Sequence, residues 1–114
     1  LNEFGDRKIK GRIDFVVDVD NRLFYVVPRG FEHEDFVPYL KGDHEKLIPV
    51  QFRFNGDTLE EIITGASSFE ARFRVKHKQK YLTLAHQFAI ELASYSNLDI
   101  NLKRNEILHI YQKR

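Results

Sequence analysis

Residues 65–78 read Gly-Ala-Ser-Ser-Phe-Glu-Ala-Arg-Phe-Arg-Val-Lys-His-Lys, and they decide how the rest of the chain is interpreted. From Phe69 to Val75 every second residue is apolar and the intervening side chains are charged, which is the period of a half-buried strand. A helix is the alternative, because Ser67 and Glu70 have the spacing of a capping box. A longer helix, however, would place lysine and histidine side chains on its buried face. We therefore predict a strand with one apolar and one cationic face.

The cationic face of this strand is the candidate anion-binding surface. Lys and Arg side chains bind phosphate oxygens and acidic protein surfaces alike, so these residue types do not distinguish RNA from an acidic protein partner. The whole chain has a formal net charge of only +1, but residues 72–114 are mainly basic and residues 32–61 are rich in acids. The predicted phosphate- or nucleic-acid-binding residues are Arg72, Arg74, Lys76, Lys78, Ser67 and Ser68.

Two β-hairpins are predicted before this stretch. Asp20 and Asn21 separate two segments rich in β-branched and aromatic residues, and both tolerate the positive φ of a type I′ turn. Asn55 and Gly56 follow an alternating segment and form the strongest short hairpin signal in the chain. Between the hairpins, residues 31–46 are predicted to be a loop with a turn or two of helix. The predicted strands are residues 12–19, 22–27, 48–54 and 58–64.

After the opening stretch, the apolar period changes to that of a helix. From about Gln79 to Tyr95, apolar residues recur three or four positions apart. Residues 98–102 and 107–111 then alternate in the manner of strands. Together these elements predict an α+β fold, with a mostly antiparallel sheet of about five to seven strands and the helix at about 79–95 packed on one face.

Length and composition indicate a single domain over residues 1–114, with residues 1–11 as a loosely ordered leader. The first residue is Leu and the chain contains no Met, which suggests a fragment of a longer protein. No apolar run is long enough to span a membrane, and we expect a soluble domain that acts in the cytoplasm. The absence of Cys excludes disulfides, thiolate metal sites and thiol nucleophiles.

Two histidines are the candidate acid and base. His33 lies between Glu32 and Glu34, and an imidazole beside carboxylates can be oriented to transfer protons near neutral pH. His77 lies at the end of the predicted cationic strand, where it either faces His33 or packs at the edge of the core. The sequence contains no His-Glu-x-x-His pair and no glycine-rich phosphate loop, so neither a metal nor a cofactor is predicted.

A hairpin at residues 11–27, the box His33-Glu34-Asp35-Phe36, a hairpin at residues 50–63 and a helix with a final strand at residues 79–102 follow one another in this chain. This order resembles the bacterial polymorphic-toxin C-terminal domains of the barnase/EndoU/RelE-like ribonuclease group. The family has a second box at the place of residues 64–70, but Ser68-Phe69-Glu70 stands here where the family has its His and Tyr. The resemblance implies metal-independent RNA cleavage. The missing histidine implies that the chain is inactive, that it uses His77 instead, or that it belongs to another family.

Two functions follow from these predictions. The first is a metal-independent ribonuclease-like domain of a bacterial toxin or phage-associated effector. In that domain His33 and His77 transfer protons, and the cationic strand binds phosphate. The alternative is a non-catalytic interaction domain, such as an immunity-type or phage accessory protein, whose basic face docks on an acidic partner or nucleic acid.

Overall fold

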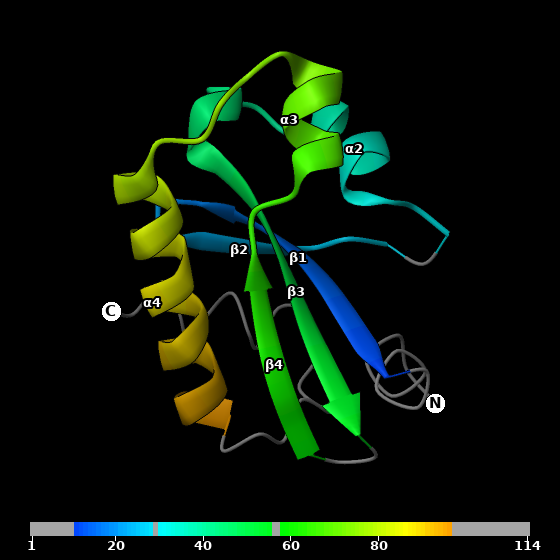
Figure 1. Ribbon diagram of the computed structural model, residues 1–114, viewed down its shortest axis with the longest axis vertical. Coiled ribbons are helices and arrows are strands. Elements are labelled where there is room, and N and C mark those ends of the chain that lie inside the picture. Colours follow the sequence, from blue (N-terminus) through cyan, green and yellow to red (C-terminus); the bar gives the residue numbers. More distant parts are fainter. Residues whose placement is uncertain (1–10, 29, 56–57, 97–114) are drawn as a thin grey trace.

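The computed structural model describes residues 11–28, 30–55 and 58–96. The fold is α+β, and its four described strands form one antiparallel sheet in the order β2-β1-β3-β4 (Figure 1). The strands are β1 (Arg12–Asp18), β2 (Leu23–Val26), β3 (Leu47–Asn55) and β4 (Thr58–Thr64). The helices are α2 (His33–Phe36), α3 (Ser67–Phe73) and α4 (Gln79–Ser96), with two 3₁₀ turns, η1 (Val37–Tyr39) and η2 (His44–Lys46).

The predicted fold class, antiparallel sheet and long helix are confirmed. The described part of the sheet has four strands, fewer than the five to seven predicted. The strands predicted at residues 98–102 and 107–111 lie outside the described residues, as does the predicted leader up to residue 10. Within the described ranges, every helix is too short or too polar to cross a lipid bilayer.

Both predicted hairpins are present, and side-chain hydrogen bonds of Asp18 stabilise the first turn. In the first, the carboxylate of Asp18 accepts hydrogen bonds from the backbone N–H of Asn21 at 3.2 Å and from its side-chain amide at 2.8 Å. The positive φ that this turn needs lies at Arg22, at 53°, one residue after the predicted pair. The second hairpin joins β3 to β4, and its register shifts between Arg53 and Phe54, where a bulge interrupts the ladder.

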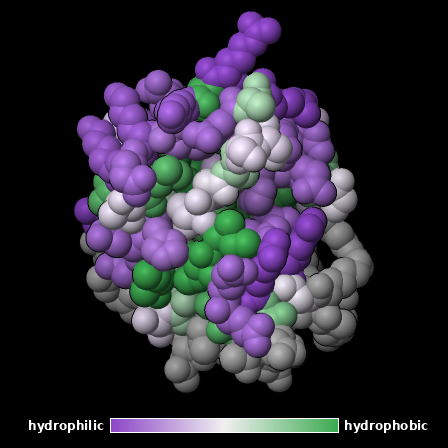
Figure 2. Space-filling model, viewed as in Figure 1, coloured by the Kyte–Doolittle hydropathy of each residue, from purple (hydrophilic) through white to green (hydrophobic). Residues whose placement is uncertain are grey.

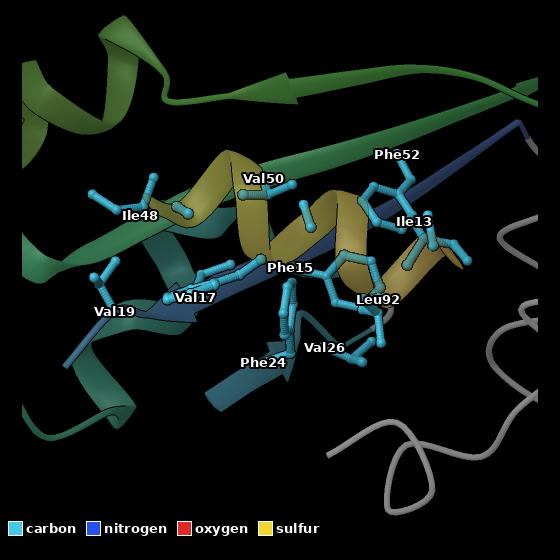
Figure 3. Packing of buried hydrophobic residues seen from close by; sticks show 14 of the residues in the cluster. Ile13, Phe15, Val17, Val19, Phe24, Val26, Ile48, Val50, Phe52 and Leu92 are labelled. Atoms are coloured by element: carbon cyan, nitrogen blue, oxygen red, sulfur yellow. The ribbon is translucent and has the colours of Figure 1, made fainter. Parts of the chain in front are cut away.

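Helix α4 covers one face of the sheet and forms the larger apolar cluster (Figures 1 and 3). Phe15 of the central strand β1 lies in the middle of this cluster and has no exposed surface. Its ring forms T-shaped contacts with Phe24 and Phe52, with centroids 5.5 and 5.0 Å away. The alternation of β1 and β3 points these rings toward the helix. The buried α4 residues that meet them are Ala85, Phe88, Ala89, Leu92 and Ala93.

The opposite face of the sheet carries a second, smaller cluster, which explains why β1 is apolar on both faces. Helices α2 and α3 and the turn η1 cover this face at one end of the molecule (Figure 1). The buried members of the second cluster are Val16, Val27, Val37, Leu47 and Phe69.

The strand predicted at residues 69–78 is wrong, because residues 67–73 form the helix α3, and Arg74 is its C-cap, where φ of 52° and ψ of 42° are left-handed. Phe69 and Phe73 are one helical turn apart, so both rings reach the second cluster, with their centroids 4.8 Å apart. Since the helix stops there, it does not carry Lys76 onto a buried face. The alternating pattern therefore arises from a short helix followed by a loop.

Candidate functional site

A row of cations connects α3 to α4, and we call it the cationic segment: Arg74, Lys76, Lys78 and Lys80. All four side chains are exposed, and none forms an ion pair with a residue that the structure describes. The ammonium group of Lys80 lies over the ring of Tyr81, 4.9 Å from its centroid. The segment is therefore a concentration of uncompensated positive charge on the surface.

The other predicted anion-binding residues have different surroundings. Arg72 lies on α3, and its guanidinium is 3.6 Å from the carboxylate of Asp35 on α2, so part of its charge is compensated. Ser67 and Ser68 are exposed in the first turn of α3. The predicted row is thus divided between a helix and a loop and does not share one strand face, although the anion-binding role of these residues stays a prediction.

Lys46 is a nearby cation that does not belong to the segment. Its ammonium group lies 2.9 Å from the carboxylate of Asp20, and this hydrogen bond raises the pKa of the lysine. At the sheet, burial and, to a lesser extent, the carboxylate of Asp18 raise the pKa of the Tyr25 phenol. Both groups keep their ordinary charge state at neutral pH, because a raised pKa favours the protonated form.

His77 is held in the interior between α3 and η2. Its side chain has no exposed surface, and the ring stacks obliquely on Phe69 at 5.3 Å. Nε2 donates a hydrogen bond to the carbonyl of His44 at 3.1 Å, so Nδ1 carries no proton in the neutral ring. The backbone N–H of His77 donates to the carboxylate of Glu70 at 2.7 Å. The core-edge interpretation of this histidine therefore fits its burial, and the ring anchors the cationic segment.

His33 occupies a different place, at the start of α2, where its ring is half-buried. Its Nε2 donates to the carbonyl of Val50 at 3.2 Å. The neighbouring acids cap the helix, since the carboxylate of Asp35 accepts from the backbone N–H of Glu32 at 3.3 Å. His33 and His77 are thus anchored on separate carbonyl groups and share no hydrogen-bond partner.

A polar network on the second face of the sheet was not predicted. Asp14 is only 1% exposed and accepts a hydrogen bond from the side-chain amide of Gln51 at 3.0 Å. The guanidinium of Arg12 lies 3.4 Å from Asp14 and 3.7 Å from Glu32. The sequence signal for this network is an aspartate among the apolar residues of β1. Its partner could not be read from the sequence, because it depends on the pairing of Asp14 with Gln51 across β1 and β3.

A groove between β4 and α4 was also missed. It has a volume of about 540 Å³ and no Lys, Arg, Asp or Glu among its lining residues. Inside it, the hydroxyl of Thr64 and Nδ1 of His86 are 2.8 Å apart. The lining residues are Ile62, Thr64, Gln79, Leu82, Thr83, His86 and Gln87.

The described residues contain no group of three or more His, Asp or Glu side chains that could hold a metal ion. Comparison with protein-family models, with curated proteins and with solved structures finds no match for this chain. The resemblance to toxin ribonucleases therefore stays a prediction.

Proposed function

We propose that this chain is a non-catalytic interaction domain whose cationic segment docks on an acidic protein surface. The observation that carries the proposal is the exposure of four cations within residues 74–80, without an ion pair to any described residue. Uncompensated positive charge on a surface speeds the encounter with a negatively charged partner. It also repels positively charged partners, which are thereby excluded.

The segment is held in place by the interior. His77 points inward and hydrogen-bonds to the carbonyl of His44, while its neighbours Lys76 and Lys78 are exposed on either side of it. The backbone between these lysines is also tied by the hydrogen bond to Glu70. A segment whose backbone is already ordered loses less conformational entropy on binding than a free loop does. This arrangement supports a docking role for the lysines.

A protein surface fits the segment better than a nucleic acid. Proteins that bind nucleic acid through its phosphates rely on many basic contacts and on a strongly positive field. Here the formal net charge of the whole chain is +1, and the segment has four cations. A small cluster of this size matches the charged rim of a protein interface.

We expect Lys76→Glu to weaken binding to a polyglutamate peptide by about tenfold, which is about 1.4 kcal/mol, because the substitution reverses one charge of the segment. Fluorescence anisotropy of the labelled peptide at about 0.1 M salt, where the Debye length is about 10 Å, measures the effect. Lys41→Glu is the matched control, since Lys41 is also exposed but lies before η2, outside the segment. The control should bind within about twofold of the unmodified chain, because Lys41 lies outside the segment and salt screens an exposed charge that the peptide does not contact.

The same titrations separate the possible outcomes. Equal losses in Lys76→Glu and Lys41→Glu would mean that the peptide senses net charge alone, and the docking proposal would then be wrong. If single-stranded RNA binds tightly, in a salt-sensitive manner, and displaces polyglutamate, the segment binds nucleic acid and not an acidic protein surface.

Metal-independent RNA cleavage is the second candidate, and the half-buried, partly accessible ring of His33 is the feature that favours it. Its proposed partner His77 has no exposed side-chain surface, whereas an acid or base must come within hydrogen-bond reach of the substrate. We expect the unmodified chain, His33→Ala and His77→Ala to show equal or no RNA cleavage in the presence of a chelator. Cleavage that His33→Ala abolishes, with the fold intact by circular dichroism, would favour the ribonuclease.

A further inference from the structure

The strand β4 lies at the edge of the described sheet, and its register shows which backbone groups face outward. Gly65 donates its N–H to the carbonyl of Pro49 at 2.8 Å, so these two residues form a hydrogen-bonded pair. Such pairs alternate with non-hydrogen-bonded pairs along an antiparallel ladder. Thr64 opposite Val50 and Ile62 opposite Phe52 are therefore non-hydrogen-bonded pairs. Their N–H and C=O groups point away from β3, toward the open edge of the described sheet.

The same two residues also line the groove beside α4. Side chains two positions apart share one face of a strand, and those of Ile62 and Thr64 face the helix residues Leu82 and His86. Figure 2 shows apolar surface in the middle of this view, over β4 and the adjacent part of α4. The groove thus combines outward-facing backbone groups with pockets for alternate side chains, which are the two features that strand addition requires.

The charge around the groove indicates the partner. No Lys, Arg, Asp or Glu lines the groove itself, which suits a peptide backbone and small neutral side chains. One end of the groove lies where Gly65, after β4, approaches Leu82 of α4. Gln79, the first residue of α4, lines the groove at this end. The residue before Gln79 is Lys78 of the cationic segment. The neutral groove therefore runs into a positively charged end, and this pattern is complementary to an extended segment that carries acidic residues beside a neutral, alternating stretch.

We propose that the groove between β4 and α4 binds an extended, acidic-ended peptide segment of a partner protein as an added strand. The backbone of the segment pairs with Ile62 and Thr64, alternate side chains enter the groove, and its carboxylates meet the cationic segment. This inference rests on the proposed docking function and specifies that the partner binds through an extended peptide segment. A nucleic acid has no backbone that can extend a β-ladder, so the groove distinguishes a peptide from RNA.

The test uses the 114-residue chain and a peptide of alternating threonine and valine with glutamates at one end, compared with polyglutamate of equal length. Thr83→Trp fills the groove without changing its charge, because Thr83 is an exposed lining residue of α4. Ile90→Trp is the matched control, on an exposed position of the same helix outside the groove. We expect Thr83→Trp to weaken binding of the alternating peptide at least tenfold, and to leave polyglutamate binding unchanged. Ile90→Trp should change neither affinity.

Amide hydrogen exchange gives a second readout that does not depend on a variant. In the free chain we expect the amides of Ile62 and Thr64 to exchange fast and the inward-facing amide of Ile63 to exchange slowly. Addition of the alternating peptide should slow Ile62 and Thr64. Slow exchange at both positions in the free monomer would show that other residues of this chain cover the edge, and would overturn the inference. Slow exchange that is lost on dilution, with a dimer by sedimentation, would overturn it in favour of a second copy.

The two proposals fail separately. If Thr83→Trp binds the alternating peptide as well as the unmodified chain does, the groove inference is wrong. The docking proposal survives that result as long as Lys76→Glu still weakens the binding of polyglutamate. If Lys76→Glu has no effect on either peptide, the docking proposal fails, and the inference that rests on it fails as well.

Discussion

Phe15→Ala is expected to lower the free energy of unfolding by about 3–5 kcal/mol, a large part of the 5–15 kcal/mol typical of a domain. Phe15 has no exposed surface and lies on the central strand β1, in edge contact with Phe24 and Phe52 (Figure 3). Truncation removes the apolar area of one ring and leaves a cavity that neighbouring strands cannot close without breaking the ladder. Urea unfolding followed by circular dichroism measures the loss.

Phe31→Ala is the control for this prediction. Phe31 is 38% exposed and contacts mainly the ring of Tyr39, at 6.2 Å between centroids. The same chemical change there should cost less than about 1 kcal/mol, as surface substitutions usually do. Similar losses at Phe15 and Phe31 would contradict the placement of Phe15 at the centre of the larger cluster.

Gly65→Ala is expected to cost about 2–4 kcal/mol for two separate reasons. Gly65 has φ of +89°, which a residue with a Cβ adopts only with strain. A Cβ at this position would also lie 3.0 Å from Cδ2 of Leu82 on α4, shorter than ordinary van der Waals contact, so the Leu82 side chain has to shift by a few tenths of an ångström. Because this glycine directly follows β4 and lies against Leu82 of α4, the change strains the packing of the helix on the sheet.

Gly30→Ala separates the two reasons. Gly30 has nearly the same φ, +88°, but a Cβ there would meet no atom within 4 Å. It should therefore show the conformational cost alone, about 1 kcal/mol. In a double-mutant cycle, Leu82→Ala should recover about 1 kcal/mol or more of the loss in Gly65→Ala. Equal losses at both glycines, or no coupling with Leu82, would refute the close approach of α4 to Gly65.

The error at residues 69–78 has an identifiable cause. Phe69, Phe73 and the intervening charged residues satisfy the period of a strand, yet the two rings also lie one turn apart on a helix. A helix that continued past Lys76 would bury lysine side chains, whereas α3 ends at Phe73 with Arg74 as its C-cap. Where a helix ends depends on the space beneath it, and the second cluster under Phe69 is built from strands distant in the sequence.

In the candidate site, too, some features can be predicted from the sequence and others depend on tertiary contacts. The cations of residues 74–80 were recognised as a row from the sequence, since charge needs no structure to be counted. The compensation of Arg72 by Asp35 and the inward position of His77 depend on contacts with α2 and η2. The groove depends on both the register of β4 and the position of α4, and no local pattern reports either of them.

Local chemistry was sufficient for the two hairpins and the long helix. The turn residues Asp20, Asn21 and Asn55, together with a change in apolar period near Gln79, predicted elements that the structure contains, because their causes lie within a few residues. The length of α3, the burial of His77 and the position of β4 at the edge of the described sheet were decided only by the tertiary structure. Each of these depends on which distant surfaces meet, and the free energy of those contacts outweighs the weak local preferences of a short segment.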